Sequence, residues 1–475
     1  MNGAAGVRRE AAGGGPARGE APLPRRIAIL GFARSGRALA EALLDRRVGL
    51  AIGDLRTEAD FEGLEALRAR GARFFLGGPS PEFLEGAEWL AVSPGVPLDS
   101  PAVERARRLG VPVLGELEIA WRIAEAEAEG RNRWIAVTGT NGKSTTSSWI
   151  ADILRRAGRP VALAGNIGTP LSGFLAERAG RDFVCEVSSF QLETIDRFRP
   201  DVAVLTNITP DHLDRYEGMA EYAAAKARVF AGQRASDVAV VNADDPGSSG
   251  IPTTARRVLF SRRGRPASGG AWLADATLWS DAAGGSARPV LRASALSLPG
   301  AHNVENALAA LAVADCLRVP EAAVVEGLTR FPGLPHRSQL VAESGGVRWV
   351  DDSKGTNVDA TAKSLEGFAP GTVILILGGR DKHGDFPALR PPVAGSVRAV
   401  LTIGEAAPVI EAALAGAAPI ERCGTLDRAV ARASELARPG DTVLLSPACA
   451  SFDQYRNFEH RGEHFAELVR VAVNR

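Results

Sequence analysis

Short apolar runs of strand length alternate with longer stretches of helical pattern along most of the chain. Runs such as 27–30, 49–52 and 89–92 each end in glycine, serine or an acidic residue. Strands that alternate with helices form parallel sheets covered on both faces, so the pattern predicts an α/β fold. No apolar run reaches the 18 residues that a membrane-spanning helix needs, and we expect no membrane insertion.

The length of 475 residues suggests about three domains. The first residues are rich in Gly, Ala, Pro and Arg without an apolar segment, which favours a disordered tail over a signal peptide. Small residues between 261 and 287 predict loops and short antiparallel strands. We expect, in chain order, a tail, a Rossmann-like domain, a central P-loop ATPase-like domain with a parallel sheet and a second Rossmann-like domain, over 1–24, 25–121, 122–333 and 334–475.

Composition excludes several classes of protein. Lys and Arg together number 56, as do Asp and Glu, and this neutrality argues against a broad nucleic-acid-binding surface. The four cysteines are scattered without metal-type spacing, which fits a reducing compartment. We therefore expect a cytoplasmic protein with no nucleic-acid or membrane partner. We also expect it to be a monomer.

Lysine usage is more informative than net charge. Only five of the 56 basic residues are lysines, which leaves 51 arginines. A lysine kept in such a chain is a candidate for work that guanidinium cannot do, such as a point charge on phosphate or a modifiable amine. For Lys363, which no motif surrounds, chance is the preferred interpretation. The lysines are Lys143, Lys226, Lys354, Lys363 and Lys382.

The strongest local motif is Gly-Thr-Asn-Gly-Lys-Ser-Thr at 139–145, between an apolar strand and a helical stretch. Backbone N–H groups would hold phosphates there, Lys143 would neutralise them, and the Ser144 hydroxyl would bind Mg²⁺. The usual spacing puts a glycine where Val137 stands, so the motif is shortened. An ordinary glycine turn is the alternative.

Three residues beyond this loop suit a metal-dependent reaction. Glu186 interrupts an apolar strand, where a carboxylate needs a metal ion or a basic partner. His212 lies between two aspartates after another strand, and beside a phosphate loop it suits a second metal position. Lys226 lies on a small-residue helix. The alternatives are a structural ion pair for Glu186, a structural role for His212 and a solvated helix cation for Lys226.

Further candidates lie near one helix and at strand ends. Asn303 and Asn306 open a helix and would contact a nucleobase, unless Asn303 is only an N-cap. In the last domain, polar loops follow three strands, where open parallel sheets bind ligands. Cys449 lies in one of them without a His/Asp arrangement, so a packed thiol is favoured over a nucleophile. The loops span 351–357, 378–382 and 446–451.

These motifs resemble those of the Mur ligases, the ATP-dependent amide ligases of peptidoglycan precursor synthesis. The resemblance runs from about residue 25 to the C-terminus. The segments typical of the whole family are 139–145, 186–193 and 302–306, and those typical of its D-glutamate-adding branch are 333–337, 352–357 and 446–458. The Asp-Asn-Pro-Arg motif of the diaminopimelate- or lysine-adding branch is absent, as is the His-bearing phosphate loop of the L-alanine-adding branch.

The resemblance implies a role for each matching residue. Those at catalytic positions are Lys143, Glu186, His212 and Lys226. Those around ATP are Gly139, Thr140, Asn141, Gly142, Lys143, Ser144, Thr145, Asn303, Asn306, Arg337 and Asp352. Those around a UDP-sugar are Ser35, Arg56, Ser93, Asn166 and His212. Those around D-glutamate are Thr356, Lys382, Ser451, Phe452 and Phe458. The ligands expected for two Mg²⁺ ions are Ser144, Glu186, His212 and Lys226, the last as a carbamate formed with CO₂.

The implied activity is the ATP-dependent joining of D-glutamate to UDP-N-acetylmuramoyl-L-alanine through an acyl phosphate. Two departures, the Gly31–Gly36 turn and Leu55, leave individual uridine contacts open. Two other functions stay open as well. One is a related amide ligase, either another Mur ligase or a folylpolyglutamate synthase, and the other is a P-loop ATPase whose output is conformational.

Overall fold

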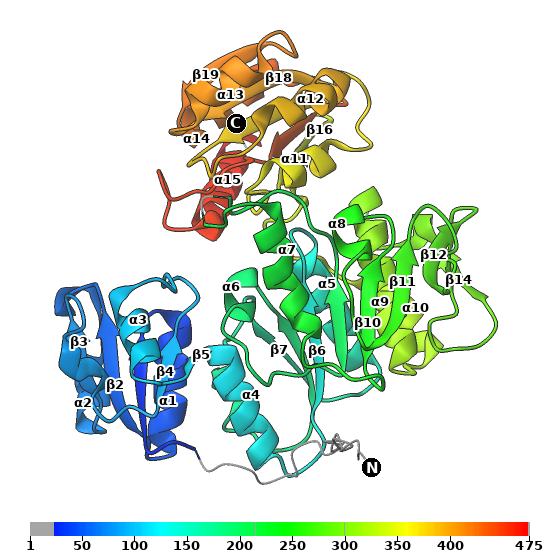
Figure 1. Cartoon of the computed structure of the whole chain (residues 1–475). Coiled ribbons are helices and arrows are strands. Elements are labelled where there is room, and N and C mark those ends of the chain that lie inside the picture. The colour runs from blue at the N-terminus through cyan, green and yellow to red at the C-terminus, as the bar shows by residue number, and fades with distance from the viewer. Residues whose placement is uncertain (1–22, 214, 299, 474–475) are drawn as a thin grey trace, which may run out of the picture. The chain divides into compact units, whose positions relative to one another are not determined.

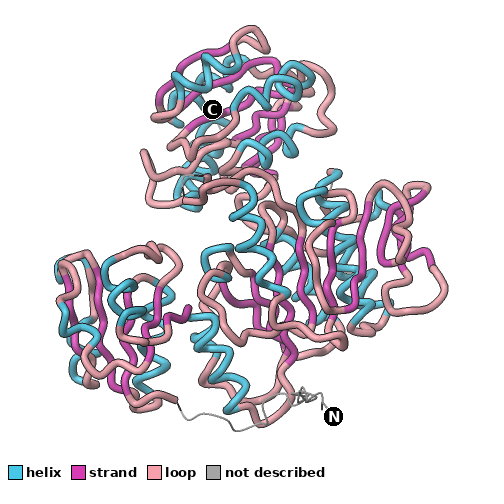
Figure 2. Tube along the Cα trace, in the orientation of Figure 1, coloured by secondary structure: helices cyan, strands magenta, loops and turns pink. Residues whose placement is uncertain are grey.

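The computed structural model describes residues 23–213, 215–298 and 300–473. The predicted tail lies outside the described residues except for its last two positions. Figures 1 and 2 show strands and helices that alternate along the chain and build three separate sheets. The α/β prediction is therefore confirmed. No helix in the described ranges is long and apolar enough to cross a membrane.

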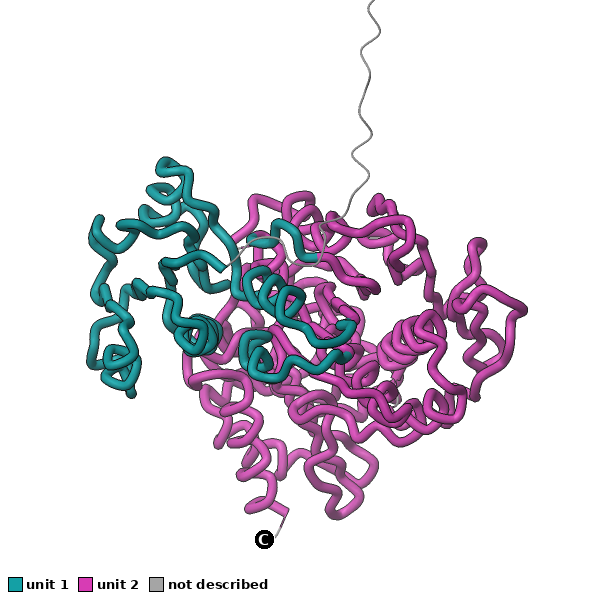
Figure 3. The backbone as a smooth tube through the Cα atoms, turned by 90° about the horizontal axis from the view of Figure 1, so that it is seen from below, with its two compact units in different colours: residues 1–132, 169–181, 194–198 teal, residues 133–168, 182–193, 199–475 magenta. Residues whose placement is uncertain are grey.

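Contacts divide the chain into two compact units (Figure 3). Unit 1 comprises residues 1–132 together with 169–181 and 194–198, and unit 2 comprises the rest. The two inserted segments are attached to helix α4 of unit 1. Glu116 accepts hydrogen bonds from Ser172 N (2.7 Å) and Oγ (2.5 Å), and Glu118 accepts from the backbone N of residues 196–198.

Unit 1 contains a five-stranded parallel sheet in the order β3-β2-β1-β4-β5. Its central strand is wholly apolar after Arg26 and packs into the core with Leu90 and Val103. The strands are β1 (Arg26–Leu30), β2 (Gly49–Asp54), β3 (Arg73–Leu76), β4 (Trp89–Val92) and β5 (Val113–Gly115). The helices are α1 (Arg34–Asp45), α2 (Leu64–Ala69), α3 (Pro101–Arg108) and α4 (Glu116–Glu127).

The first sheet of unit 2 has nine strands in the order β14-β13-β12-β11-β10-β9-β6-β8-β7. Strands β6 to β12 pair in parallel, and β12, β13 and β14 pair antiparallel, as small residues in this region predict. The strands are β6 (Arg133–Thr138), β7 (Val161–Gly165), β8 (Asp182–Glu186), β9 (Val202–Leu205), β10 (Val238–Asn242), β11 (Arg256–Ser261), β12 (Gly270–Ala274), β13 (Thr277–Ser280) and β14 (Arg288–Arg292).

Helices α5 and α9 pack on this sheet around the fully buried Trp149. The Trp149 ring stacks on Phe331 at 5.2 Å, and its Nε1 donates to Gly327 O (2.9 Å), so α5, the helix that follows the phosphate loop, is anchored in the core. The helices around the sheet are α5 (Lys143–Arg156), α6 (Ser189–Leu192), α7 (Met219–Ala227), α8 (Pro246–Ser249), α9 (Ala301–Cys316) and α10 (Glu321–Arg330).

The second sheet of unit 2 has six strands in the order β15-β16-β20-β17-β18-β19, parallel except for β15. Strands β16, β20 and β17 are neighbours, so the loops that follow them share one edge. The strands are β15 (Gln339–Ser344), β16 (Val347–Asp351), β17 (Val373–Gly378), β18 (Val397–Ile403), β19 (Ile420–Gly424) and β20 (Thr442–Leu445). The helices are α11 (Val358–Leu365), α12 (Arg390–Ser396), α13 (Ala407–Leu414), α14 (Leu426–Leu436) and α15 (Phe458–Val473).

Short 3₁₀ helices complete the secondary structure of the described residues. They are Glu58–Asp60, Pro81–Leu84, Leu171–Phe174, Arg228–Phe230, Ala293–Ala295 and Phe386–Leu389.

Candidate active site

The predicted phosphate loop connects β6 to the 14-residue helix α5. Gly142 ends the loop with a φ of 82°, and a Cβ there would lie 2.3 Å from Asn306 Oδ1, so glycine is required. Lys143 Nζ donates to the carbonyls of Gly139 (2.9 Å) and Thr140 (2.6 Å) and so folds back over the loop. A glycine-closed loop, a helix N-terminus and a lysine amine together suit the binding of phosphate.

Glu186 ends β8, the neighbour of β6, and is 1% exposed. Asn166 Nδ2 donates to Glu186 Oε1 (2.6 Å), whereas Oε2 is buried with no hydrogen-bond partner among the described residues. Burial alone would raise the pKa of Glu186, but the charges of Lys143 and Arg337 outweigh it and lower the pKa. The site thus holds an ionised carboxylate with one oxygen left for a cation.

Lys226 lies on α7 and is 2% exposed. Its Nζ donates to Gly139 O (2.8 Å) and lies 4.4 Å from the centre of the Tyr222 ring. Burial, with the nearby charge of Lys143, lowers the pKa of Lys226 well below its ordinary value. The solvated-cation alternative is therefore wrong, because the amine is buried beside the phosphate loop, where its charged form is disfavoured.

His212 and Asp211 follow β9, the other neighbour of β6. His212 adopts a left-handed φ of 56°, and its ring packs edge-on against Phe190 at 4.9 Å. Asp211 is paired with Lys382, whose Nζ donates to Oδ1 at 2.7 Å. Although burial raises the pKa of Asp211, Lys382 and His212 lower it to about 2, so Asp211 is ionised. This ion pair joins the last domain to the loop that carries His212.

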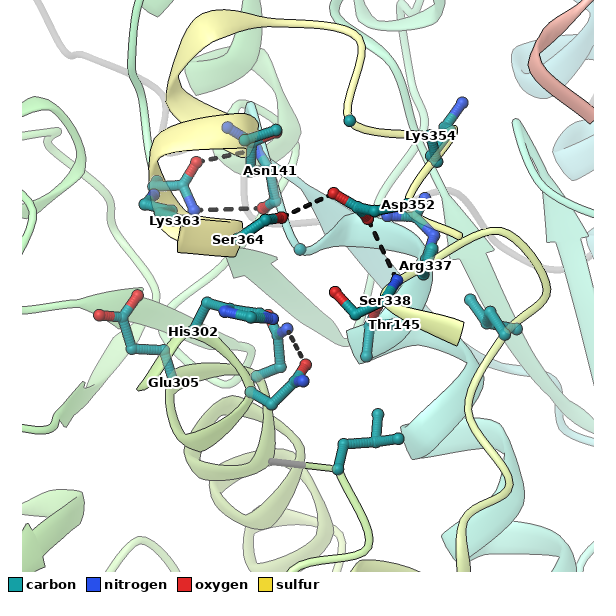
Figure 4. A pocket seen from close by; sticks show the side chains of 18 residues that line it. Asn141, Thr145, His302, Glu305, Arg337, Ser338, Asp352, Lys354, Lys363 and Ser364 are labelled. Atoms are coloured by element: carbon teal, nitrogen blue, oxygen red, sulfur yellow. Dashed lines mark hydrogen bonds between the residues drawn. The ribbon is translucent and has the colours of Figure 1, made fainter. Parts of the chain in front are cut away.

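A pocket lies beside the phosphate loop (Figure 4). Asn303 lies in the first turn of α9, whose N-cap is Gly300, so the N-cap alternative is wrong. Burial lowers the pKa of His302 to about 4, which leaves a neutral imidazole in the pocket wall. The predicted ATP residues that line the pocket are Asn141, Gly142, Thr145, Asn303, Asn306, Arg337 and Asp352.

Two charged side chains from the part of the chain that follows α10 also line the pocket. Arg337 Nη2 donates to Ser144 Oγ (2.5 Å). Asp352 Oδ2 accepts from the hydroxyls of Ser364 (2.6 Å) and Ser446 (2.8 Å), while burial raises its pKa to about 6. A ribose hydroxyl needs a fixed hydrogen-bond acceptor, and the Asp352 carboxylate is an acceptor held in place by these hydroxyls.

The loops after β16, β17 and β20 are tied together by backbone hydrogen bonds. Ala448 N donates to Gly355 O (2.8 Å), and Arg380 N donates to Ala450 O (2.8 Å). The predicted glutamate residues on these loops therefore share one edge of the sheet, although Phe452 is 62% exposed. Burial raises the pKa of Cys449 to about 12, as expected for a packed thiol. The glutamate residues are Thr356, Lys382, Ser451, Phe452 and, at the start of α15, Phe458.

In unit 1 the predicted UDP-sugar residues lie where β1, β2 and β4 end. Ser93 Oγ donates to Gly31 O (2.7 Å). Arg56 donates to Asp54 through Nε (3.0 Å) and Nη2 (2.9 Å), and Phe32 N donates to Asp54 Oδ2 (2.7 Å). Asp54 thus holds both the glycine turn and Arg56, although the sequence does not single it out. Ser35 lies in the first turn of α1, and the remaining two, Asn166 and His212, belong to unit 2.

The residues present fit a magnesium ion at Glu186. The buried, partnerless Oε2 of this ionised carboxylate is an oxygen ligand of the kind Mg²⁺ prefers, and Ser144 lies in the first turn of α5, which follows the neighbouring strand β6. Among the described residues no group of three or more His, Cys, Asp or Glu side chains is arranged for a metal. The predicted ligand set contains only two such residues, with a serine and a carbamate beside them.

Comparison with known proteins agrees with this geometry. Three family models match: "Mur ligase MurD-like, N-terminal domain" at residues 25–115, "Mur ligase middle domain" at 137–314 and "Mur ligase, glutamate ligase domain" at 336–449. The chain belongs to the Mur ligase family. The family predicted from the motifs is thereby confirmed.

Curated relatives match this Mur ligase over nearly their whole length. A UDP-N-acetylmuramoylalanine–D-glutamate ligase of Acidobacterium capsulatum is 43% identical over 94% of the chain and 96% of its own length. Its namesake from Anaeromyxobacter dehalogenans is 44% identical over 94% and 97%. Among solved structures, a pseudomurein peptide ligase type C from Methanothermus fervidus has a TM-score of 0.60 at 18% identity over 94% of the chain and 99% of its own, which shows a shared fold.

The structure also brings Lys354 and Lys363, to which the motifs give no role, to the wall of the pocket beside the phosphate loop. Lys363 Nζ lies 3.0 Å from Asp359 Oδ2 on the same helix. Asp211 pairs with Lys382, and Asp359 accepts hydrogen bonds from Asn141 and Thr209. The scarcity of lysine is the signal that points to the two lysines, whereas no local pattern marks the two aspartates.

Proposed function

We propose that this Mur ligase joins D-glutamate to UDP-N-acetylmuramoyl-L-alanine in peptidoglycan precursor synthesis, with ATP converted to ADP and phosphate. The observation that carries the proposal is the position of Lys382. This cation, suited to the side-chain carboxylate of glutamate, comes from the glutamate ligase domain and lies 2.7 Å from Asp211, next to His212. The names of the relatives support the same substrates.

In the proposed reaction, an L-alanyl carboxylate oxygen attacks the γ-phosphorus of ATP and ADP leaves. The glutamate amine then attacks the acyl carbon, and phosphate leaves from the tetrahedral intermediate. Lys143 and the N–H groups of the phosphate loop neutralise the transferred phosphoryl group, since such transfer depends mainly on position and charge. Bound Mg²⁺ would supply further charge neutralisation, with Ser144, Glu186, His212 and carbamylated Lys226 as its proposed ligands.

The carbamate has a specific physical basis in this chain. Only a neutral amine attacks CO₂, and burial beside Lys143 lowers the pKa of Lys226 and so favours that form. The product is an anion, which places an opposite charge near Lys143. We further propose that the enzyme acts as a monomer in the cytoplasm, where its four free cysteines stay reduced.

The test is phosphate release from ATP with UDP-N-acetylmuramoyl-L-alanine and D-glutamate, L-glutamate or no amino acid, with the product identified by mass. We expect release and a dipeptidyl product with D-glutamate alone. Product with another amino acid would favour a different amide ligase, and release without acceptor would favour a conformational ATPase. Either result would refute the proposal.

Replacing Lys382 tests the glutamate end of the site. We expect Lys382→Ala to raise the KM for D-glutamate by about 10-fold or more, because a charged hydrogen bond is lost, with a small change in the KM for ATP. Arg380→Ala is the matched control, since Arg380 lies on the same loop and its side chain pairs with the exposed Glu405. Equal KM values for glutamate in the two variants would contradict this assignment.

A further inference from the structure

Asp359, in the first turn of α11, connects the last domain to the phosphate loop. Its Oδ2 accepts a hydrogen bond from Asn141 Nδ2 (2.7 Å) and another from Thr209 Oγ (3.0 Å). Both donors belong to the central domain, and they lie 218 and 150 residues away in the sequence. Lys363 Nζ, one turn along α11, lies 3.0 Å from the same oxygen.

Asn141 is held from two sides. Its backbone is fixed to the end of β9, since Asn141 N donates to Asn207 Oδ1 (2.9 Å) and Asn141 O accepts from Thr206 Oγ (2.6 Å). Its side chain is fixed to α11, because Nδ2 donates to Asp359 and Oδ1 accepts from Asn357 Nδ2 (3.3 Å). Both polar atoms of this side chain therefore contact the last domain.

The same short segment also carries a proposed glutamate contact. Thr356 directly precedes Asn357, whose side chain caps α11 by accepting from Ala360 N (2.8 Å). Four consecutive residues thus run from the glutamate loop to the carboxylate that holds Asn141. A shift of this segment would therefore also move Asn357 and Asp359, the residues that bind Asn141 of the phosphate loop.

Lys363 explains how an aspartate is tolerated here. A lone carboxylate beside a polyphosphate site would repel the ligand, and the pairing with Lys363 offsets that charge. The hydrogen bonds that Asp359 accepts keep their strength, because the acceptor is still ionic.

We propose that Asp359 is a positioning residue that couples the seating of the glutamate ligase domain to the geometry of the phosphate loop. Phosphoryl transfer is then fast only when the domain that delivers the amino acid is in place. This proposal rests on the proposed function. It gives Asp359, together with Lys363, a role in that reaction through their effect on Asn141.

The experiment compares Asp359→Ala with Asp427→Ala by steady-state kinetics. Asp427 is a matched control, since it also lies in the first turn of a helix of the last domain, and its one ion-pair partner among the described residues is His464, at 3.7 Å. We expect Asp359→Ala to lower kcat by about 10-fold or more, as loss of a charged hydrogen bond implies, with the KM for the UDP-sugar unchanged. Asp359→Asn, which retains an acceptor oxygen, should recover part of kcat. A kcat within about 2-fold of wild type in Asp359→Ala would overturn the proposal.

A double-mutant cycle covers the case in which Asp359→Ala does not fold. Thr209→Val removes the hydroxyl at nearly constant shape, so it is combined with Asp359→Leu, which removes the acceptor at a similar size. If both substitutions remove the same contact, the kcat of the double variant should be no lower than that of the slower single variant. A kcat reduced by the product of the two single effects would overturn the coupling. Wild-type product formation is measured first. Its absence would refute the proposed function, while normal product with unaffected variants would refute the coupling alone.

Discussion

Lys226 shows how burial changes the chemistry of a single side chain. An ammonium at 2% exposure loses its hydration, and the charge of Lys143 disfavours it further. We expect Lys226→Ala to lower kcat by at least about 100-fold, because the proposed carbamate ligand of Mg²⁺ is lost. Added short carboxylic acids should restore part of the activity by replacing the carbamate.

The control for this rescue is Lys143→Ala. Lys143 acts as a cation, so a carboxylate in its place would repel phosphate and no rescue is expected. Activity titrated against formate and acetate in both variants measures the difference. Full activity of Lys226→Ala without additives would remove Lys226 from the mechanism.

Lys354 allows a prediction with a defined pH range. Burial, aided by the charge of Arg337, lowers its pKa to about 8, and its Nζ lies 4.0 Å from the Phe458 ring centre. Above pH 8 the amine is mainly neutral, and bound phosphates favour its charged form. We therefore predict that nucleotide binding takes up a proton at pH 8.5 and less at pH 6.5, where the amine is already charged.

Calorimetry of ADP binding in buffers of different ionisation enthalpy measures this uptake. Lys354→Met should reduce the buffer dependence at pH 8.5, because the group that gains the proton is gone. An apparent binding enthalpy that is identical in all buffers at pH 8.5 would contradict the prediction.

At the scale of elements, the loop before α5 depends on one backbone conformation. Gly142 has a φ of 82° and no room for a Cβ beside Asn306. We expect Gly142→Ala to weaken ADP binding by about 10-fold or more, since strain and a clash both fall on the loop. Gly158→Ala is the matched control, because Gly158 has a φ of 73° just beyond the same helix but open space around it. Equal loss of affinity in both variants would show that strain alone is responsible.

The elements around the site illustrate what the sequence predicts and what it does not. The apolar run at 202–205 is β9 without change, and the polar residues after such strands meet because β8, β6 and β9 are parallel neighbours. Strands β7 and β11 are absent from the prediction, although β7 consists of apolar and small residues and β11 has six residues. The contact of α11 with the phosphate loop is also missed, because residues 218 positions apart meet through packing that no local pattern encodes.

At the scale of the whole molecule, sequence order and spatial grouping differ. The segments 169–181 and 194–198 follow the phosphate loop in the sequence, yet their contacts group them with unit 1. Two buried carboxylates on α4 explain this, since each accepts backbone hydrogen bonds from one segment. Such long-range anchoring cannot be derived from periodicity. The predicted domain boundaries at 121/122 and 333/334 stay predictions.

The pocket beside the phosphate loop, which we propose binds ATP, draws on both sheets of unit 2, with Asn303 on α9 and Asp352 after β16. A ligand that binds only the folded form stabilises every segment that contributes to its site. We therefore predict that ADP slows hydrogen exchange both in α9 and in α11, whereas β1 of unit 1 is unaffected by ADP alone. Exchange measured by mass spectrometry, with and without ADP, tests this.

Arg337→Ala is the informative variant, because it removes the hydrogen bond to Ser144 that joins the segment between α10 and β15 to the phosphate loop. In that variant we expect the protection of α11 by ADP to fall more than the protection of α9. Protection confined to α9 in the wild type would show that the last domain takes no part in binding the nucleotide.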